Sequence, residues 1–193
     1  MAILTFTEDR IEFSFDTALW DIVKWDDSPE FLGPLGIRRL NGELAQIPQG
    51  TKAVDFVGLH RDDLYLFEVK DFRGHGPENA ERQEHELPLE IGLKVRDTIA
   101  GILGAQRIQP SPWLLRATAA LRERARKLHV IAWIAEDRPR GSKARRVHNK
   151  TTLVRSAQLQ QRLAWCTRIA WADDPLAPFT VLSGVHARTI RTS

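Results

Sequence analysis

Residues 52–72 read KAVDFVGLHRDDLYLFEVKDF, two apolar runs that are separated by the polar stretch HRDD. Charge interrupts both runs, at Asp55 in the first and at Glu68 and Lys70 in the second. A buried strand normally excludes such groups, because an unpaired charge is costly to remove from water. These three side chains therefore need partners or a function.

A turn centred on residues 61–62 fixes the register of two strands, which we expect at about 52–59 and 64–71. In this register Asp55 lies directly opposite Glu68. Opposed Cβ atoms of an antiparallel pair are roughly 4.5–5.5 Å apart, so the two carboxylates repel each other. A cation must therefore offset their charge.

Lys70 is one candidate for that cation, because alternating side chains place it on the same face as Glu68. A divalent metal is a better one, since two carboxylate oxygens and a nearby carbonyl suit Mg²⁺ or Mn²⁺. A metal held by Asp55 and Glu68 would polarise a phosphate and lower the pKa of a bound water. Lys70 would orient or deprotonate that water, or stabilise negative charge in the transition state. This set of groups is typical of phosphodiester hydrolysis.

Asp55, followed by EVK at 68–70 on the next strand, resembles the PD-(D/E)XK nuclease superfamily, although Val54 replaces the proline of its name. The chain also resembles uncharacterised bacterial members of this superfamily. The resemblance implies a restriction-endonuclease-like α/β fold, with an αβββαβ core and a mixed central sheet flanked by helices. It implies Mg²⁺ or Mn²⁺ at Asp55 and Glu68, and a catalytic role for Lys70.

The resemblance also implies further site residues on two helices. Members of the superfamily often add an acidic residue from the first helix or its end, and Asp26 in KWDD is the first choice here. The alternatives are Asp21, Asp27 and Glu30. The helix after the motif often supplies a polar residue, and Lys94 or Asp97 could do so because both lie off its apolar stripe.

Patterns along the rest of the chain indicate mixed α/β structure in a single domain, residues 1–193, with a core at about 16–136. In the first part of the chain we expect a hairpin or edge strand at 3–15, a short helix at 16–25 capped by Asp16, a loop at 26–36, and a strand or hairpin at 37–47 around Asn41-Gly42. After the motif we expect helices at about 89–103, 112–126 and 152–165. Further strands are expected at 128–136 and in IAWAD and FTVLSG. The C-terminal helix and short strands occupy 150–185. The helix at 89–103 carries one apolar stripe and can end at Gly104.

Composition narrows the class of protein. The net charge of +3 permits a polyanionic partner without requiring one. Cys166 is the single cysteine, so an intrachain disulfide and a Cys-based zinc site are excluded. No apolar run approaches the roughly 18 residues of a membrane helix. The N-terminus lacks a secretory pattern, so we expect a cytoplasmic protein with no membrane partner.

Two other features have alternative interpretations. The basic stretch RPRGSKARRVHNK, 138–150, either follows a phosphate backbone or forms a solvated surface loop. The tryptophans could stack on bases, but we expect Trp133 in a buried strand and Trp20 and Trp165 on amphipathic helices to lie in the core.

These observations predict a metal-dependent endonuclease that acts on nucleic acid, with DNA as the first choice. By analogy it would work as a homodimer or with a partner protein, in DNA repair, restriction or phage defence. The alternative is a catalytically silent subunit of the same fold, which binds nucleic acid or a protein through the basic stretch. A silent site has no reason to hold repelling carboxylates together, and this favours the enzyme.

Overall fold

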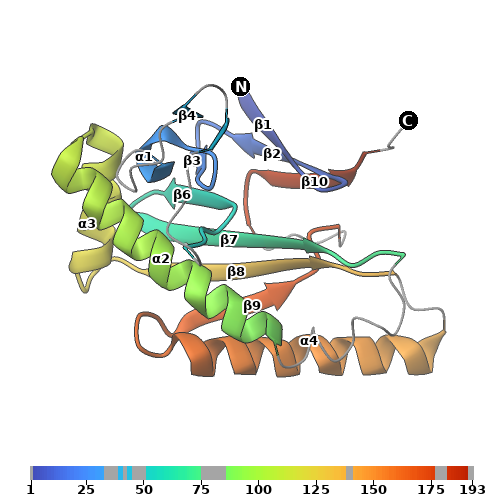
Figure 1. The fold of residues 1–193 in the computed structure, drawn as a ribbon. Coiled ribbons are helices and arrows are strands. Elements are labelled where there is room, and N and C mark those ends of the chain that lie inside the picture. Colours follow the sequence, from blue (N-terminus) through green and yellow to red (C-terminus); the bar gives the residue numbers. More distant parts are fainter. Residues whose placement is uncertain are drawn as a thin grey trace.

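The computed structural model describes residues 2–32, 39–40, 43–44, 51–74, 86–137, 141–176 and 182–190 of the 193-residue chain (Figure 1). A mixed five-stranded sheet organises the fold, in the order β3-β6-β7-β8-β9. Its strands are β3 (Trp20–Lys24), β6 (Phe56–His60), β7 (Asp63–Asp71), β8 (Leu128–Ala135) and β9 (Ile169–Asp173). The first three strands run antiparallel, and β7, β8 and β9 run parallel to one another.

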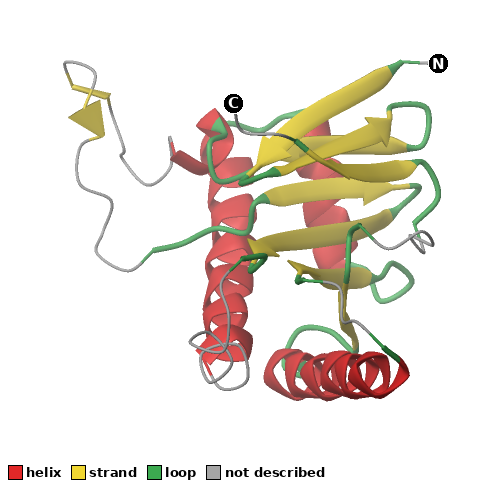
Figure 2. Cartoon of the chain, turned by 90° about the vertical axis from the view of Figure 1, so that its right-hand side faces the viewer, coloured by secondary structure: helices red, strands yellow, loops and turns green. Residues whose placement is uncertain are grey.

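Helices make the crossovers between the parallel strands, as parallel pairing requires. They are α2 (Leu87–Ile108) and α3 (Pro112–Arg122) between β7 and β8, and α4 (Ser142–Leu163) between β8 and β9; the short α1 (Pro29–Leu32) precedes them. Both ribbon views place α2 across one face of the sheet, with α4 along the β9 side (Figures 1 and 2). On α2 the side chains of Ile91, Val95 and Ile102 are fully buried, so the expected apolar stripe faces the sheet.

A three-stranded antiparallel sheet covers the opposite face, in the order β1-β2-β10. It consists of β1 (Ile3–Glu8), β2 (Ile11–Asp16) and β10 (Val185–Thr189). Alternate residues of β2, including Phe13 and Phe15, are fully buried. Phe13 stacks on Trp133 of β8, with 4.8 Å between ring centroids, so the two sheets share an aromatic core.

The structure confirms the central prediction of the sequence, the hairpin and its register. Leu59 pairs with Leu64 and Phe56 with Phe67, although the first strand begins at Phe56 rather than at residue 52. The hairpin at 3–15 is present as β1 and β2. Two short strands, β4 (Arg39–Leu40) and β5 (Glu43–Leu44), confirm a hairpin within 37–47, while Asn41-Gly42 lies outside the described residues.

The helix predicted at 16–25 is wrong, because this segment contributes strand β3. Trp20 and Ile22 are buried and Asp21 between them is exposed, which is the alternation of a strand. Gly58 makes close pairing possible, since a Cβ atom there would lie 3.2 Å from Ile22 and 3.3 Å from Trp20. The α/β class and the mixed sheet are confirmed, but a three-stranded sheet, not a helix, covers the second face.

Several other boundaries also differ from the predictions. Helix α2 continues through Gly104 to Ile108. Helix α4 begins at Ser142 rather than near residue 152, so much of the basic stretch is helical and not a loop. The last strand is β10, which follows FTVLSG and joins the smaller sheet. Within the described parts of the chain, no helix is long and apolar enough to span a membrane.

The predictions for the tryptophans were partly wrong. Trp133 and Trp20 are buried as expected, at 2% and 3% exposure, although Trp20 lies on a strand. Trp165 follows the end of α4 and is 59% exposed, so it is not a core residue.

Candidate active site

The face of the sheet under α2 carries the charged residues of the motif. Alternation along β7 turns Glu68 and Lys70 toward this face, together with the buried Leu64 and Leu66. Asp55 immediately precedes β6, whose Phe56 pairs with Phe67 of β7. The predicted register therefore brings the three motif residues together beneath the helix.

Helix α2 completes the cluster with two residues one turn apart, Glu90 and Lys94. The Nζ atom of Lys94 lies 2.6 Å from Oε1 of Glu68 and 3.6 Å from Oδ1 of Asp55. Lys70 Nζ lies 3.0 Å from the same Glu68 oxygen and donates a hydrogen bond to Glu90 Oε1 at 3.0 Å. Two lysines thus supply part of the cationic charge required between the carboxylates.

Backbone contacts fix the orientation of Asp55. Its Oδ2 atom accepts a hydrogen bond of 2.6 Å from the backbone N–H of Val69. Its backbone carbonyl accepts another, at 2.8 Å, from the N–H of Trp25. The carboxylate is therefore held between β7 and the segment that follows β3, with Oδ1 directed toward Lys94.

The two motif carboxylates are almost completely buried, with 5% exposure for Asp55 and 1% for Glu68. Burial raises the pKa of Glu68 to about 7, and the negative charge of Asp55 adds to this effect. Burial also raises the pKa of Asp55. Among the described residues, Glu68 Oε2 has no hydrogen-bond partner. The two lysines therefore do not fully compensate the pair of carboxylates.

The lysines remain strongly cationic in this setting. Burial alone lowers the pKa of Lys70 and that of Lys94. The adjacent carboxylates outweigh burial, chiefly Glu68 in both cases, and both pKa values are raised. Neither amine is therefore a base at neutral pH in this arrangement, and each is suited to stabilise negative charge on a phosphate.

A second acidic group adjoins Asp55. One carboxylate oxygen from each of Glu8, Asp26 and Asp55 lies within 4.8 Å of the others. Burial raises the pKa of Asp26 to about 6, and its buried Oδ1 atom has no hydrogen-bond partner in the described part of the chain. Lys24 Nζ offsets part of the charge, 3.0 Å from Glu8 Oε2. Carboxylate oxygens at this density are the hard donors that Mg²⁺ and Mn²⁺ prefer.

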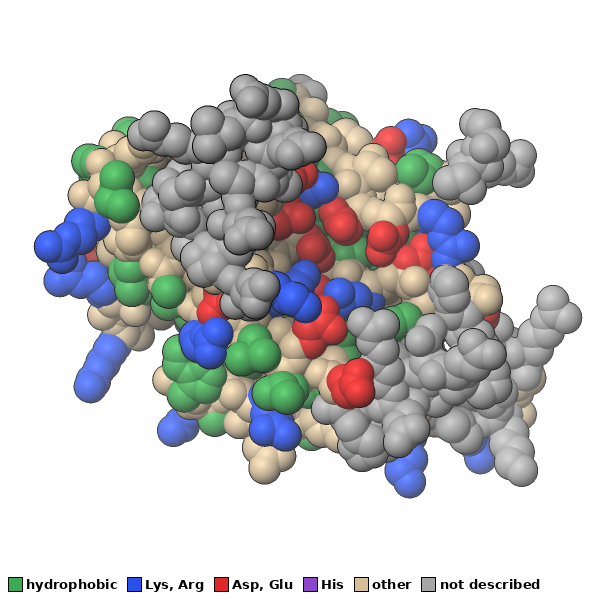
Figure 3. Space-filling view, in the orientation of Figure 1, with side chains coloured by type: hydrophobic (Ala, Val, Ile, Leu, Met, Phe, Trp, Pro, Cys, Tyr) green, Lys and Arg blue, Asp and Glu red, His purple; other side chains and the backbone are tan. Residues whose placement is uncertain are grey.

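Figure 3 shows acidic side chains beside Lys and Arg side chains in the middle of the molecular face that is turned to the viewer. The three motif residues converge as the sequence predicted. Asp26 lies next to Asp55, although it follows a strand and not a helix. Lys94 reaches the site, whereas Asp97 accepts a hydrogen bond from the backbone N–H of Lys52 instead.

Two of the alternatives to Asp26 form ion pairs, Asp21 away from the site and Asp27 at its edge, with the same Lys24 that contacts Glu8. Asp21 lies 2.9 Å from Arg116 Nη1, and Asp27 lies 3.4 Å from Lys24 Nζ. Both contacts are partly exposed, as expected of surface pairs.

Sequence reasoning missed two residues, Glu8 and Glu90. A helical spacing could have indicated Glu90, because residues four apart lie on one face of a helix and Lys94 was already a candidate. No local pattern marks Glu8, since it lies on β1 near the N-terminus, outside the hairpin and helix that carry the motif.

Comparisons with known proteins give little information about this site beyond its geometry. No protein-family model matches this chain, and no solved structure matches it significantly. A cysteine–tRNA ligase from Neisseria meningitidis serogroup A / serotype 4A (strain DSM 15465 / Z2491) is 30% identical over 118 residues. The match covers 53% of this chain and 17% of the ligase. The chain thus spans less than a fifth of that relative's length, and the match does not assign it to a family.

Proposed function

We propose that this protein is a metal-dependent nuclease that hydrolyses phosphodiester bonds in DNA. One observation carries the proposal: Asp55 and Glu68 are buried side by side with Lys70, while Glu68 Oε2 lacks a hydrogen-bond partner in the described residues. A buried, undercompensated carboxylate pair is unfavourable for folding and is typical of a site that binds a cation.

The topology supports the same proposal. In the five-stranded sheet, β3, β6 and β7 form an antiparallel meander with α1, β4 and β5 inserted between β3 and β6, and α2 and α3 then lead to β8, which is parallel to β7. This βββαβ order agrees with the restriction-endonuclease-like core that the motif implies, apart from the missing first helix. Asp55 and the EVK segment at 68–70 lie on the second and third strands of the meander, or next to them.

The residues take the following roles in the proposed reaction. A divalent metal bound at Asp55 and Glu68, with Asp26 and Glu8 as neighbouring oxygen donors, would supply a Lewis acid and acidify a water. Lys70, which Glu90 holds through its hydrogen bond, orients the attacking water or stabilises charge on the phosphate. Lys94 provides a second ammonium group for a phosphate oxygen. A homodimer or a partner protein would be needed for cleavage of both strands.

Cleavage of supercoiled plasmid, linear duplex and single-stranded DNA with Mg²⁺ or Mn²⁺ tests the proposal. We expect Glu68→Gln and Lys70→Met to reduce cleavage at least about 100-fold, because each removes a group from the reacting centre. Glu123→Gln and Lys127→Met are matched controls on exposed residues and should retain full activity. Failure to cleave any substrate with either metal, without any effect of metal on the melting temperature, would overturn it.

One observation favours the alternative, a silent subunit that binds nucleic acid or a protein. The short contact between Lys94 and Glu68 lets a lysine take the place that a metal would otherwise hold. In that case metal would leave both the melting temperature and DNA binding unchanged. Lys94→Met would then destabilise the protein instead of increasing its affinity for Mg²⁺.

A further inference from the structure

Large apolar side chains are exposed along the side of α2 that faces away from the sheet. Leu89, Leu93 and Leu103 are 49%, 42% and 43% exposed, and the nearby Trp165 is 59% exposed. Scattered exposed leucines are ordinary on protein surfaces, but a contiguous patch of them marks an interaction site.

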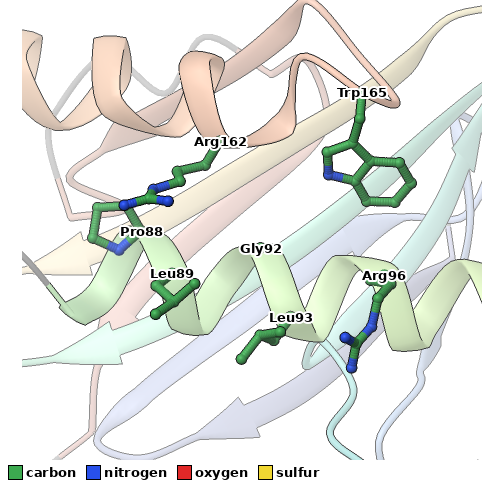
Figure 4. A pocket seen from close by; sticks show the side chains of 7 residues that line it. All are labelled: Pro88, Leu89, Gly92, Leu93, Arg96, Arg162 and Trp165. Atoms are coloured by element: carbon green, nitrogen blue, oxygen red, sulfur yellow. The ribbon is translucent and has the colours of Figure 1, made fainter.

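The patch lines a groove between α2 and the end of α4, with a volume of about 450 Å³. We call this the α2–α4 groove, lined by Pro88, Leu89, Gly92, Leu93, Arg96, Arg162 and Trp165. Figure 4 shows Arg162 and Trp165 reaching from the α4 side toward α2. The groove is thus a gap between two helices with an apolar floor and a basic edge.

Helical periodicity separates this groove from the candidate active site. Leu89, Leu93 and Arg96 are four and three residues apart and lie on one stripe of α2. Glu90 and Lys94 lie on a different stripe, about a third of a turn away at 100° per residue. The groove and the active site are therefore separate surfaces of the same helix.

A second groove continues the patch toward α3. It is lined by Ile99, Leu103, Ala120, Leu121, Arg122, Glu123, Arg124, Arg126, Leu128, Trp165 and Cys166. Trp165 lines both grooves and joins them into one apolar track along α2. From Leu89 to Leu103 the track is about 21 Å long at 1.5 Å per residue, which matches a helix of about four turns.

Arginines outnumber acidic residues in the described lining of the track. Among the described residues, five arginines line it, Arg96, Arg122, Arg124, Arg126 and Arg162, against one carboxylate, that of Glu123. Glu123 already pairs with Arg126 at 2.7 Å, and Arg96 pairs with the neighbouring Asp97, with 2.7 Å between Nη2 and Oδ1. Among the described residues, Arg122, Arg124 and Arg162 form no ion pair, so the rim carries uncompensated positive charge.

We propose that the track along α2 binds an acidic amphipathic helix of a partner protein. The leucines and Trp165 would accept apolar side chains at positions i, i+3, i+4 and i+7, as in other helix-in-groove interfaces. The arginines would pair with carboxylates on both sides of that apolar stripe. This inference is independent of the proposed nuclease activity, because the track and the active site share no residue.

Two other occupants fit the surface less well. A nucleic-acid strand would use the arginines, but leucines offer nothing to phosphates, and among the described residues Trp165 is the single exposed aromatic residue lining the track. A second copy of the same face would oppose arginines to arginines across a two-fold axis, which is repulsive.

Four labelled probes test the proposal by fluorescence anisotropy with the intact chain. The Leu/Glu peptide is an 18-residue helical peptide with Leu at the i, i+3, i+4, i+7 positions and Glu elsewhere. The Leu/Lys peptide has Lys in place of Glu, and the Ala/Glu peptide has Ala in place of Leu. The fourth probe is an 18-nucleotide oligo-dT. We expect the Leu/Glu peptide to bind, and the Leu/Lys and Ala/Glu peptides to bind at least ten-fold more weakly.

Surface variants locate the binding. The double variant Leu93→Ala, Trp165→Ala should weaken the Leu/Glu peptide at least ten-fold, and Arg96→Glu with Arg162→Glu should reverse the preference toward the Leu/Lys peptide. Leu153→Ala is the matched control, since Leu153 is 71% exposed on α4 and lines neither groove. Unchanged circular dichroism and melting temperature confirm that each variant is folded.

The other results overturn the proposal. Equal affinity for the Leu/Glu and Leu/Lys peptides removes the role of charge. Oligo-dT binding that the groove variants abolish, without peptide binding, assigns the track to nucleic acid. Absence of binding by all four probes rejects a helix-docking surface. None of these results depends on DNA cleavage, so the two proposals fail separately.

Discussion

Strand β7 carries two buried carboxylates three residues apart, Glu68 and Asp71, and their surroundings differ completely. The side chain of Asp71 is 2% exposed, and both of its oxygens are saturated. Oδ1 accepts hydrogen bonds from the N–H and Nε of Arg73, and Oδ2 accepts from Arg10 Nε and Arg73 Nη2. Burial alone raises the pKa of Asp71, but these guanidinium contacts outweigh it and lower the pKa to about 2.

Glu68 lies deeper in the protein, and among the described residues only its Oε1 atom has partners. Burial raises its pKa to about 7 despite two adjacent lysines. The two side chains therefore show opposite pKa shifts, because Glu68 is more deeply buried and fewer of its lone pairs are satisfied. Asp71 joins the β1–β2 turn to the end of β7 and has the features of a structural ion pair, whereas Glu68 has those of a binding site.

Asp71→Asn should give the largest effect on stability. A pKa lowered from 3.8 to about 2 corresponds to about 2 kcal/mol of stabilisation, which the variant loses at pH 7. For a chain of this size, we expect the melting temperature to fall by about 4–8 °C. Thermal unfolding followed by circular dichroism measures this shift.

The pH dependence checks the cause of that loss. Since the folded pKa is the lower one, the stabilisation is complete above about pH 4 and disappears as the pH falls toward 2. The difference between wild type and variant should shrink over that interval. Asp62→Asn is the control, because Asp62 is 73% exposed and lies 3.4 Å from Arg126, so it should change stability by less than about 0.5 kcal/mol. Equal losses of stability in Asp71→Asn and Asp62→Asn would show that the ion pairs of Asp71 stabilise the fold no more than an exposed pair does.

Added metal should raise the melting temperature by binding at Asp55 and Glu68, and Asp71 should have no part in this effect. If 10 mM Mg²⁺ is about ten times the dissociation constant, it stabilises the folded chain by about 1.4 kcal/mol. We expect a rise of about 3–6 °C in the melting temperature of wild type and of Asp71→Asn. Asp55→Asn and Glu68→Gln should show no such rise, and an equal rise in all four proteins would assign the effect to another site.

Local patterns explain why the sequence predicted the cluster around Asp55 and Glu68. The turn at 61–62 and the alternation of side chains fix the register of Asp55 against β7, and both are properties of one hairpin. Helical spacing brings Lys94 from the next element. The residues of a single βα unit could therefore be placed without knowledge of the rest of the fold.

Apart from Asp26, which the family resemblance suggested, the sequence did not predict contacts between distant segments. Glu8 and Arg10 reach the two carboxylate clusters from β1 and its turn, where no local pattern marks them. The strand at Trp20–Lys24 was mistaken for a helix because five residues are too few to separate the two periods. Its identity depends on pairing with β6 at Gly58, which is a tertiary contact.

Glu68→Gln should give the smallest effect and the opposite sign to Asp71→Asn. A carboxyl pKa raised from 4.5 to about 7 means that ionisation of Glu68 opposes folding, so wild type loses stability as the pH rises through this interval. Gln does not ionise and still accepts a hydrogen bond from Lys94. In metal-free buffer at pH 8 we expect a gain of about 1 kcal/mol, or about 2–4 °C.

The gain should shrink as the pH falls below 7 and vanish near about pH 3, where Glu68 is largely protonated in both the folded and the unfolded chain because its ordinary pKa is 4.5. Glu123→Gln, on an exposed residue, controls for the loss of one negative charge and should change the melting temperature little at either pH. If Glu68→Gln instead lowers the melting temperature at pH 8 as Asp71→Asn does, its contacts with the two lysines form a structural ion pair. That outcome would give Glu68 and Asp71 the same role and favour the silent subunit over the nuclease.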